Sequence, residues 1–234
     1  MGTSASNSGG SGGAWTDFKR DASLFARHGG RGRAAKALAG YVAVAGGAAA
    51  ATSSAAAGIR AGQSLGRFLA ASTGPTGMAG GLEAVGLANL VGVNRFEVLS
   101  GLADAFAGPG SDIEEQAARD ALLDVLNDIL PDDATIPLVD VRLDETAVID
   151  ALRRFVAALV YNRAIPTIDE RLTRLQNPQL ARQRDEEIRG YIEVLVRLRT
   201  EHASPLTLDW RGPEGAALIN GVLRAAYDQL EAFQ

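Results

Sequence analysis

Residues 37–66 read ALAGYVAVAGGAAAATSSAAAGIRAGQSLG, and this stretch decides the fold because almost every side chain in it is small. No charged residue occurs from Ala37 to Ile59, so length alone would admit a membrane span. Alanine and glycine contribute little to membrane insertion, and polar residues interrupt the run, so no span is expected. We expect closely packed helices that need partners, because each glycine lowers helix stability by about 1 kcal/mol relative to alanine.

Three glycines near the end of this stretch recur every four residues: Gly58, Gly62 and Gly66. At this spacing they share one helix face, where a neighbouring backbone can approach closely. The last two also frame Ser64 in the G-x-S-x-G pattern of hydrolase nucleophiles. That chemistry requires a strand before the serine, whereas the preceding residues have a helical composition, so we do not expect a nucleophile.

Downstream, apolar residues recur at helical spacing, and capping residues precede the runs. The expected caps are Asn94, Ser111 with Glu114, Asp144, and Asn177 before Pro178. Pro166 is expected to end the helix that follows Asp144, with a short helix capped by Thr167 after it. Residues 71–81 are expected to form a loop, and residues 131–143 an extended or irregular segment. The fold class is therefore all-α.

Upstream, Thr16 is expected to cap a short helix that ends at His28–Gly30 and turns Phe18, Ala22 and Phe25 inward. A basic cluster surrounds this helix: Lys19, Arg20, Arg27, Arg31, Arg33 and Lys36. The cluster is interpreted either as a solvated face or as a surface for an anionic partner or a membrane.

Charge and glycine content divide the chain near residue 110. Residues 1–110 hold nine basic and five acidic residues and 23 of the 27 glycines, whereas residues 111–234 hold fourteen basic and 23 acidic residues. We expect a disordered tail over 1–14, an Ala/Gly-rich helical region over 15–110 and a helical domain over 111–234. The net charge of −5 argues against general nucleic-acid binding, and the absence of cysteine suits a reducing cytoplasm.

The first fourteen residues are rich in glycine and serine, and no charge appears before Asp17. Such a segment buries too little apolar area to become ordered, so Trp15 and Phe18 are the first expected anchors. Removal of the initiator Met would leave the Gly2 amine as a nucleophile, because the pKa of an α-amine is about 8 against about 10.4 for lysine. The same opening, with Ser6, matches the N-myristoylation pattern, which would give a membrane-associated protein, but we do not expect this modification or a membrane partner.

Motifs of cofactor chemistry are missing from the sequence. There is no phosphate-binding G-x-x-x-x-G-K-[ST] motif and no dinucleotide fingerprint after a strand. Two histidines and no cysteine argue against a transition-metal site. Asp185, Glu186 and Glu187 are expected to pair with Arg182 and Arg189 on a solvated helix face. We therefore expect no catalytic residues, no metal and no cofactor.

The segments MGTSASNSG over residues 1–9 and GRGRAAKALAGYV over residues 30–42 resemble the QatB family. These are accessory proteins of a four-component bacterial anti-phage defence operon. The resemblance covers about the first sixty residues, and the remainder shares only a helical, acidic character. It implies an anti-phage defence component that is not itself an enzyme.

The resemblance also implies a partner. QueC-like enzymes activate a 7-deazaguanine carboxylate with ATP and add nitrogen to it, and in related defence systems a partner's N-terminal glycine looks to supply that nitrogen. Gly2 would then be the acceptor, with Thr3, Ser4, Ala5 and Ser6 inside the enzyme's cleft. The helical body would dock on the QueC-like enzyme or on the ATPase of the operon. The alternatives are a membrane-associated protein and a structural helical adaptor with an inert tail.

Overall fold

The structure, a computed structural model, describes residues 11–131, 136–175, 177–197 and 205–233. These ranges contain ten α-helices, two short 3-10 helices and no strand, which confirms the all-α prediction. The α-helices are α1 (Ser11–His28), α2 (Arg31–Val44), α3 (Ala48–Ser53), α4 (Ala56–Ala71), α5 (Gly77–Ala84), α6 (Arg95–Ala107), α7 (Ile113–Ile129), α8 (Glu145–Leu172), α9 (Pro178–Arg197) and α10 (Pro213–Glu231). The 3-10 helices are η1 (Ala88–Leu90) and η2 (Pro205–Thr207).

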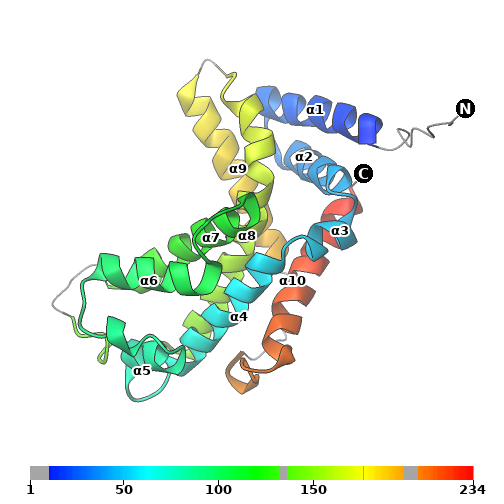
Figure 1. Cartoon of the computed structure of the whole chain (residues 1–234). Helices are drawn as coiled ribbons and strands as arrows, with labels where there is room; N and C mark the ends of the chain where they lie inside the picture. The colour runs from blue at the N-terminus through cyan, green and yellow to red at the C-terminus, as the bar shows by residue number, and fades with distance from the viewer. Residues whose placement is uncertain (1–10, 132–135, 176, 198–204, 234) are drawn as a thin grey trace, which may run out of the picture.

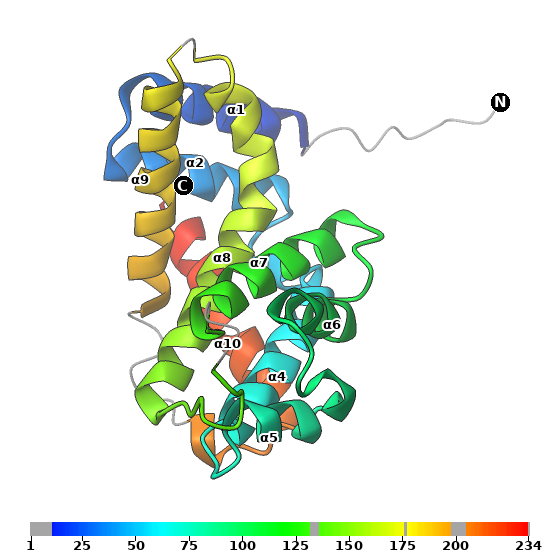
Figure 2. The ribbon, with the colours of Figure 1, turned by 90° about the vertical axis from the view of Figure 1, so that its left-hand side faces the viewer.

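Helix α8, with 28 residues, runs through most of the length of the molecule (Figure 1). Helices α1 and α2 lie at one end of the fold, and α5 and α6 lie toward the other. Helix α9 returns alongside α8, while α10 packs against α2, α3 and α4 (Figure 2). Six of the other α-helices contact α8: α1, α2, α4, α7, α9 and α10.

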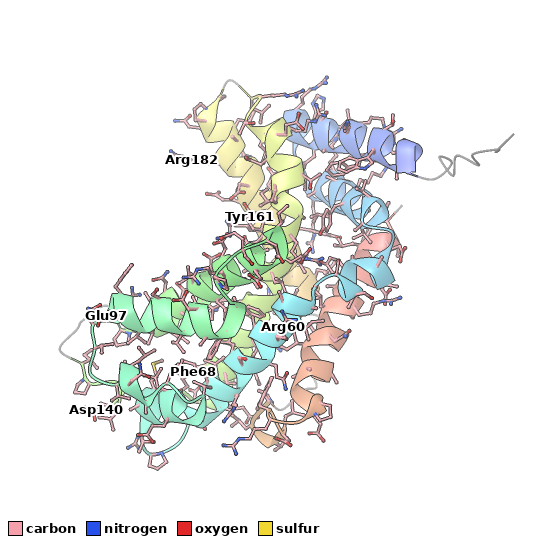
Figure 3. All side chains as sticks on the ribbon, in the orientation of Figure 1. Arg60, Phe68, Glu97, Asp140, Tyr161 and Arg182 are labelled. Atoms are coloured by element: carbon pink, nitrogen blue, oxygen red, sulfur yellow. The ribbon has the colours of Figure 1, made fainter. Side chains whose placement is uncertain are left out.

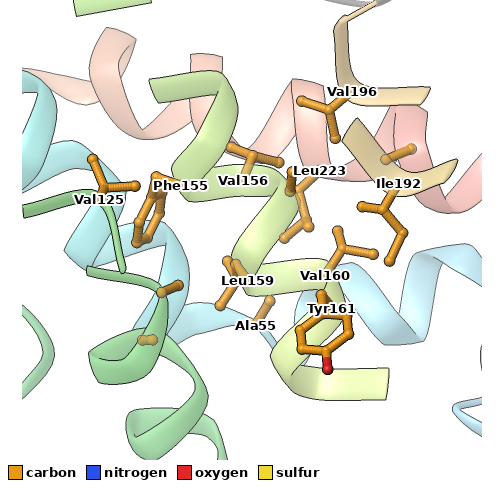
Figure 4. Packing of buried hydrophobic residues seen from close by; sticks show 14 of the residues in the cluster. Ala55, Val125, Phe155, Val156, Leu159, Val160, Tyr161, Ile192, Val196 and Leu223 are labelled. Carbon is orange, nitrogen blue, oxygen red and sulfur yellow. The ribbon is translucent and has the colours of Figure 1, made fainter. Parts of the chain in front are cut away.

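One hydrophobic cluster extends from Phe18 in α1 to Leu230 in α10. Figure 4 shows its centre, where Phe155, Val156, Leu159 and Val160 of α8 meet residues of α7, α9 and α10. Both sides of residue 110 contribute to this cluster. The division expected there is a boundary in composition, across which the core continues.

The glycine face of α4 packs against bulky side chains. A Cβ atom at Gly58 would lie 2.4 Å from Leu159 Cδ2, one at Gly62 2.8 Å from Phe155 Cε1, and one at Gly66 2.2 Å from Trp210 Cζ3. The close approach expected from the spacing is present, but it is made by side chains rather than by a neighbouring backbone. The reason is that α8 and the loop before α10 present large residues, which fill the space left by the missing Cβ atoms.

The Ala/Gly stretch is divided among three helices, α2, α3 and α4. Gly46 and Gly47 separate α2 from α3 with φ angles of +89° and +90°, a backbone conformation that favours glycine. In the described part of the chain no helix combines the length and apolarity needed to cross a membrane.

Three of the six predicted caps are confirmed. The side chain of Asn94 accepts a hydrogen bond from Glu97 N at 3.0 Å, and the side chain of Asp144 accepts one from Ala147 N at 2.8 Å. The side chain of Asn177 accepts a hydrogen bond from Gln179 N at 3.0 Å. The capping box expected at Ser111 and Glu114 is formed one residue later, by Asp112 and Glu115. Asp112 caps α7, and Glu115 accepts from the backbone N–H and the hydroxyl of Ser111, which leaves Glu114 free to turn inward.

Two predicted helix boundaries are wrong. Pro166 lies inside α8, which continues to Leu172, so Thr167 caps no separate helix. Ile168 and Leu172 are buried beyond the proline, and this packing offsets the hydrogen bond that a proline removes. In α1 the helix begins at Ser11, so residues 11–14 of the expected tail are helical, and Thr16 donates to Gly12 O inside the helix instead of capping it.

The connecting segments also differ from expectation in one place. Residues 71–81 were expected to form a loop, but α5 begins at Gly77. Met78 N donates to Val141 O at 2.9 Å, so the irregular segment before α8 supports the first turn of α5. The described part of residues 131–143 is irregular, as expected.

Substitution of Gly66 tests the close packing of α4. Trp210 is 5% exposed, and its indole N–H donates to Pro205 O at 2.7 Å, so the ring cannot retreat from a new methyl group. We expect Gly66→Ala to lower the free energy of unfolding by about 1–3 kcal/mol through overpacking, as measured by chemical denaturation. Gly190→Ala in α9 is the matched control, because no atom lies within 4 Å of the added Cβ, and it should raise stability by up to about 1 kcal/mol. Equal stability of Gly66→Ala and wild type would contradict the packing.

Candidate functional site

The proposed acceptor Gly2 and the recognition residues Thr3, Ser4, Ala5 and Ser6 lie outside the described residues. The two expected anchors lie in α1 and differ in burial. Phe18 is 1% exposed and belongs to the core, whereas Trp15 is 40% exposed. Trp15 packs edge-on to Phe18, with the two ring centroids 5.9 Å apart, and Lys19 Nζ lies 5.8 Å from the centroid of the Trp15 ring. Of the two, only Phe18 is held in the core.

The first turn of α1 is open to solvent. Gly12 and Gly13 are exposed, and a Cβ atom added at either would meet no other atom within 4 Å. No described element covers the point at which residues 1–10 join the helical body.

Helix α9 holds the turn between α1 and α2. Gly29 has a φ of +59° and packs against the buried guanidinium of Arg184, where a Cβ atom would be 2.1 Å from Nη1. Arg184 Nη1 donates to Glu187 Oε1 at 2.6 Å, and Glu187 Oε2 accepts from Gly30 N at 2.7 Å. Glu187 therefore contacts the turn of the α1–α2 hairpin and does not lie on the solvated face expected for residues 185–187.

A polar groove of about 360 Å³ lies among α7, α8 and α9. Tyr161, labelled in Figure 3, lies on its α8 wall, and its hydroxyl donates to Asp185 on α9. Arg189 stacks on the Tyr161 ring at 3.7 Å and donates from Nε to Asp185 Oδ2 at 3.1 Å. The expected pairing of Asp185 with Arg189 is thus confirmed.

The charges of this groove largely compensate one another. Arg154 Nη1 donates to Asp128 Oδ2 at 2.7 Å, and Arg189 Nη1 lies 3.8 Å from Asp124 Oδ2. Burial raises the pKa of Asp124, and its carboxylate neighbours raise it further, against the lowering effect of Arg189. Burial, together with the bond to Asp185, raises the pKa of Tyr161, so this phenol stays neutral and holds α8 to α9.

A second cluster of polar groups surrounds Arg163, which is 5% exposed. Its guanidinium forms two hydrogen bonds to Glu114, Nε to Oε2 at 2.7 Å and Nη2 to Oε1 at 2.9 Å. It also donates to Ala51 O at 2.8 Å, to Ser54 Oγ at 2.7 Å and to Tyr227 OH at 2.5 Å. One side chain of α8 thereby joins α3, α7 and α10.

The Arg163 cluster is suited to holding helices rather than to proton transfer. Burial disfavours the charge of Arg163, but Tyr227 and Glu114 more than offset this effect, so the pKa of the guanidinium is raised. Burial disfavours the phenolate of Tyr227 and so raises the pKa of this side chain. Arg163 belongs to no functional motif in the sequence. A signal was present, because Phe155, Leu159 and Arg163 follow one another at intervals of four and so share the buried face of α8.

The described residues show no arrangement of nucleophile and base. Ser64 lies within α4 instead of following a strand, which is inconsistent with a nucleophile elbow. His28 is exposed at the end of α1, and His202 lies outside the described residues. Within the same ranges no group of three or more acidic or histidine side chains could hold a metal ion.

Removal of the Arg163 guanidinium tests its role as a clasp. Arg163→Met leaves Ala51 O and Glu114 without their buried donor, so we expect the free energy of unfolding to fall by about 3 kcal/mol. Arg174→Met is the control, because Arg174 and its partner Glu170 are 63% and 58% exposed. That change should cost less than about 1 kcal/mol in the same denaturation experiment. Equal effects of the two substitutions would exclude the clasp.

The four tyrosines provide a pH-dependent test. Burial raises the pKa of Tyr41, Tyr161, Tyr191 and Tyr227. In the unfolded chain tyrosine ionises near pH 10, so above this pH the unfolded state loses protons that the folded state retains, and stability falls as pH rises. We expect the tyrosinate absorbance of the native protein to rise well above pH 10, together with unfolding. Protein in concentrated guanidinium chloride should titrate near pH 10, and a native titration that coincides with it would refute the burial of these phenols.

Comparison with known proteins identifies a family for this helical chain. The family model described as "QatB: Qat anti-phage system associated protein QatB" matches residues 46–230, from the turn before α3 to the last turn of α10. No curated protein matches the chain, and no solved structure matches it. The match overlaps only residues 46–60 of the opening segment on which the resemblance was based, so the helical body carries the assignment. Because the match spans most of the sequence, the chain belongs to the QatB family of Qat anti-phage system associated proteins.

Proposed function

We propose that this anti-phage component is the acceptor of a covalent modification at its N-terminus and is not itself an enzyme. After removal of Met1, the Gly2 amine would attack a 7-deazaguanine carboxylate that a QueC-like partner has activated with ATP. An amide would form, and the activating group would leave. The helical body would dock on that enzyme or on the operon's ATPase, in the cytoplasm where ATP is present.

The observation that carries this proposal is the open junction between residues 1–10 and α1. Gly12 and Gly13 are exposed, and an added Cβ at either would meet nothing within 4 Å, so the described body leaves the first turn of α1 uncovered. The Gly2 amine has no Cβ beside it, and its ordinary pKa near 8 leaves a useful free-base fraction at neutral pH. Family membership supports a role in defence beside other Qat components.

Intact mass spectrometry of protein co-expressed with the other Qat components tests the proposal. The wild-type mass is expected to show loss of Met1 and addition of a deazaguanine group. Gly2→Ala, which also permits Met1 removal, should be modified less because of its Cβ, and Gly2→Glu, which retains Met1, should not be modified. Omission of the QueC-like component should abolish the adduct. Wild-type protein with an unmodified or acylated Gly2 would refute the proposal.

Deletion of residues 2–10 separates this function from an inert tail. The deletion leaves α1 and the core intact, so the protein should fold but fail to protect cells against phage. Full protection by the deleted protein would instead indicate a structural adaptor.

A further inference from the structure

A positively charged surface lies on α1 and the beginning of α2. Five exposed basic side chains there form no ion pair with a described carboxylate: Lys19, Arg27, Arg31, Arg33 and Lys36. Arg20 differs, because Asp17 and Asp21 hold it at 3.0 and 3.1 Å. The surplus arises from the sequence, since no aspartate or glutamate occurs from residue 22 to residue 82.

Two large apolar side chains accompany these cations on α1. Trp15 and Leu24 are each 40% exposed, although neighbouring positions of the helix bury Phe18, Ala22 and Phe25 almost completely. Tryptophan and arginine are enriched in protein interfaces, where an aromatic side chain fills a pocket and charges surround it. Trp15, Lys19 and Arg27 lie along one stripe of α1 because they are spaced by multiples of four residues, whereas Leu24, nine residues after Trp15, points to the opposite side of the helix. This stripe combines an apolar anchor with unpaired positive charge.

The length of the chain before Ser11 limits where an enzyme acting on Gly2 can sit. Ten residues span at most about 35 Å when fully extended, so the active site must lie within that distance of the start of α1. Helices α5 and α6 lie toward the opposite end of the molecule (Figure 1). Of the described elements, α1 is the one directly joined to the acceptor segment.

The mixture of side chains on α1 favours a protein over a polyanion or a lipid surface. Asp17 and Asp21 pair with Arg20 and interrupt the cations along α1, so this helix lacks the continuous positive charge that favours a phosphate backbone or anionic headgroups. Only Trp15 and Leu24 among the large apolar side chains of α1 are exposed, which gives little area for membrane burial. A protein surface can place carboxylates opposite Lys19 and Arg27 and an apolar pocket opposite Trp15, and so matches both the cations and the apolar side chain.

We propose that the stripe of α1 that carries Trp15, Lys19 and Arg27 is the docking surface for an acidic surface of the enzyme that modifies Gly2. This inference rests on the proposed function for the identity of the enzyme. Docking here holds the amine near the active site, and the opposite charges accelerate association.

Charge reversal on α1 tests the docking surface. The double variant Lys19→Glu/Arg27→Glu changes two exposed side chains and should leave the circular dichroism spectrum and melting temperature near those of wild type. We expect its affinity for the purified QueC-like component to fall at least about tenfold. The control Arg142→Glu/Arg211→Glu makes the same change in net charge at exposed positions outside α1 and α2, and it should bind within about twofold of wild type. Trp15→Ala, which changes no charge, should also weaken binding.

The outcomes separate this inference from the proposed function. Equal binding by the two charge-reversal variants, or equal loss in both, would overturn the docking surface. The same is true if Lys19→Glu/Arg27→Glu weakens binding only to phosphatidylserine vesicles or to duplex DNA. If binding depends on α1 but Gly2 of the wild type stays unmodified, the docking surface stands and the proposed function fails. If Gly2 is modified equally fast in wild type and the α1 variant at low enzyme concentration, the docking inference fails and the proposed function stands.

Discussion

The contact between the glycine face of α4 and the bulky side chains around it sets the distance from α4 to α8 and to the segment before α10. Leu159, Phe155 and Trp210 occupy the space that Cβ atoms would take at Gly58, Gly62 and Gly66. Glycine weakens an isolated helix, so α4 depends on this packing for its stability. In return, the absence of side chains on one face lets α8 and the residues before α10 lie close to α4.

Buried cations fix the arrangement that the glycine face permits. Arg163 binds partners on α3, α7 and α10 from its place on α8, and Arg184 with Glu187 holds the turn between α1 and α2. A buried charge stabilises only when its hydrogen bonds are satisfied, so these contacts select one arrangement of the helices. The body is thus specified by a few directional contacts within a core of small residues.

This construction is consistent with a protein whose chemistry lies at its end and not in its core. The described polar clusters use their donors and acceptors on one another, whereas α1 presents exposed cations and an open first turn. Under the proposed function, the body's task is to position and recognise, and the partner supplies activation. The family match over residues 46–230 makes the chain a Qat anti-phage system associated protein, and it covers the helical body from α3 to α10.

The sequence by itself determined the helical class, three of the six predicted caps and the inward face of α1, because helical periodicity and local capping depend on neighbouring residues. Thus Asn94, Asp144 and Asn177 cap helices as expected, and Phe18, Ala22 and Phe25 are buried. Only the tertiary structure decided that α8 continues through Pro166, that Glu114 turns to Arg163 and that side chains fill the glycine face. These outcomes depend on residues distant in the chain, whose packing outweighs local preferences of about 1–3 kcal/mol. The acceptor at Gly2 stays a prediction from amine chemistry and family resemblance, since neither helical periodicity nor core packing bears on it.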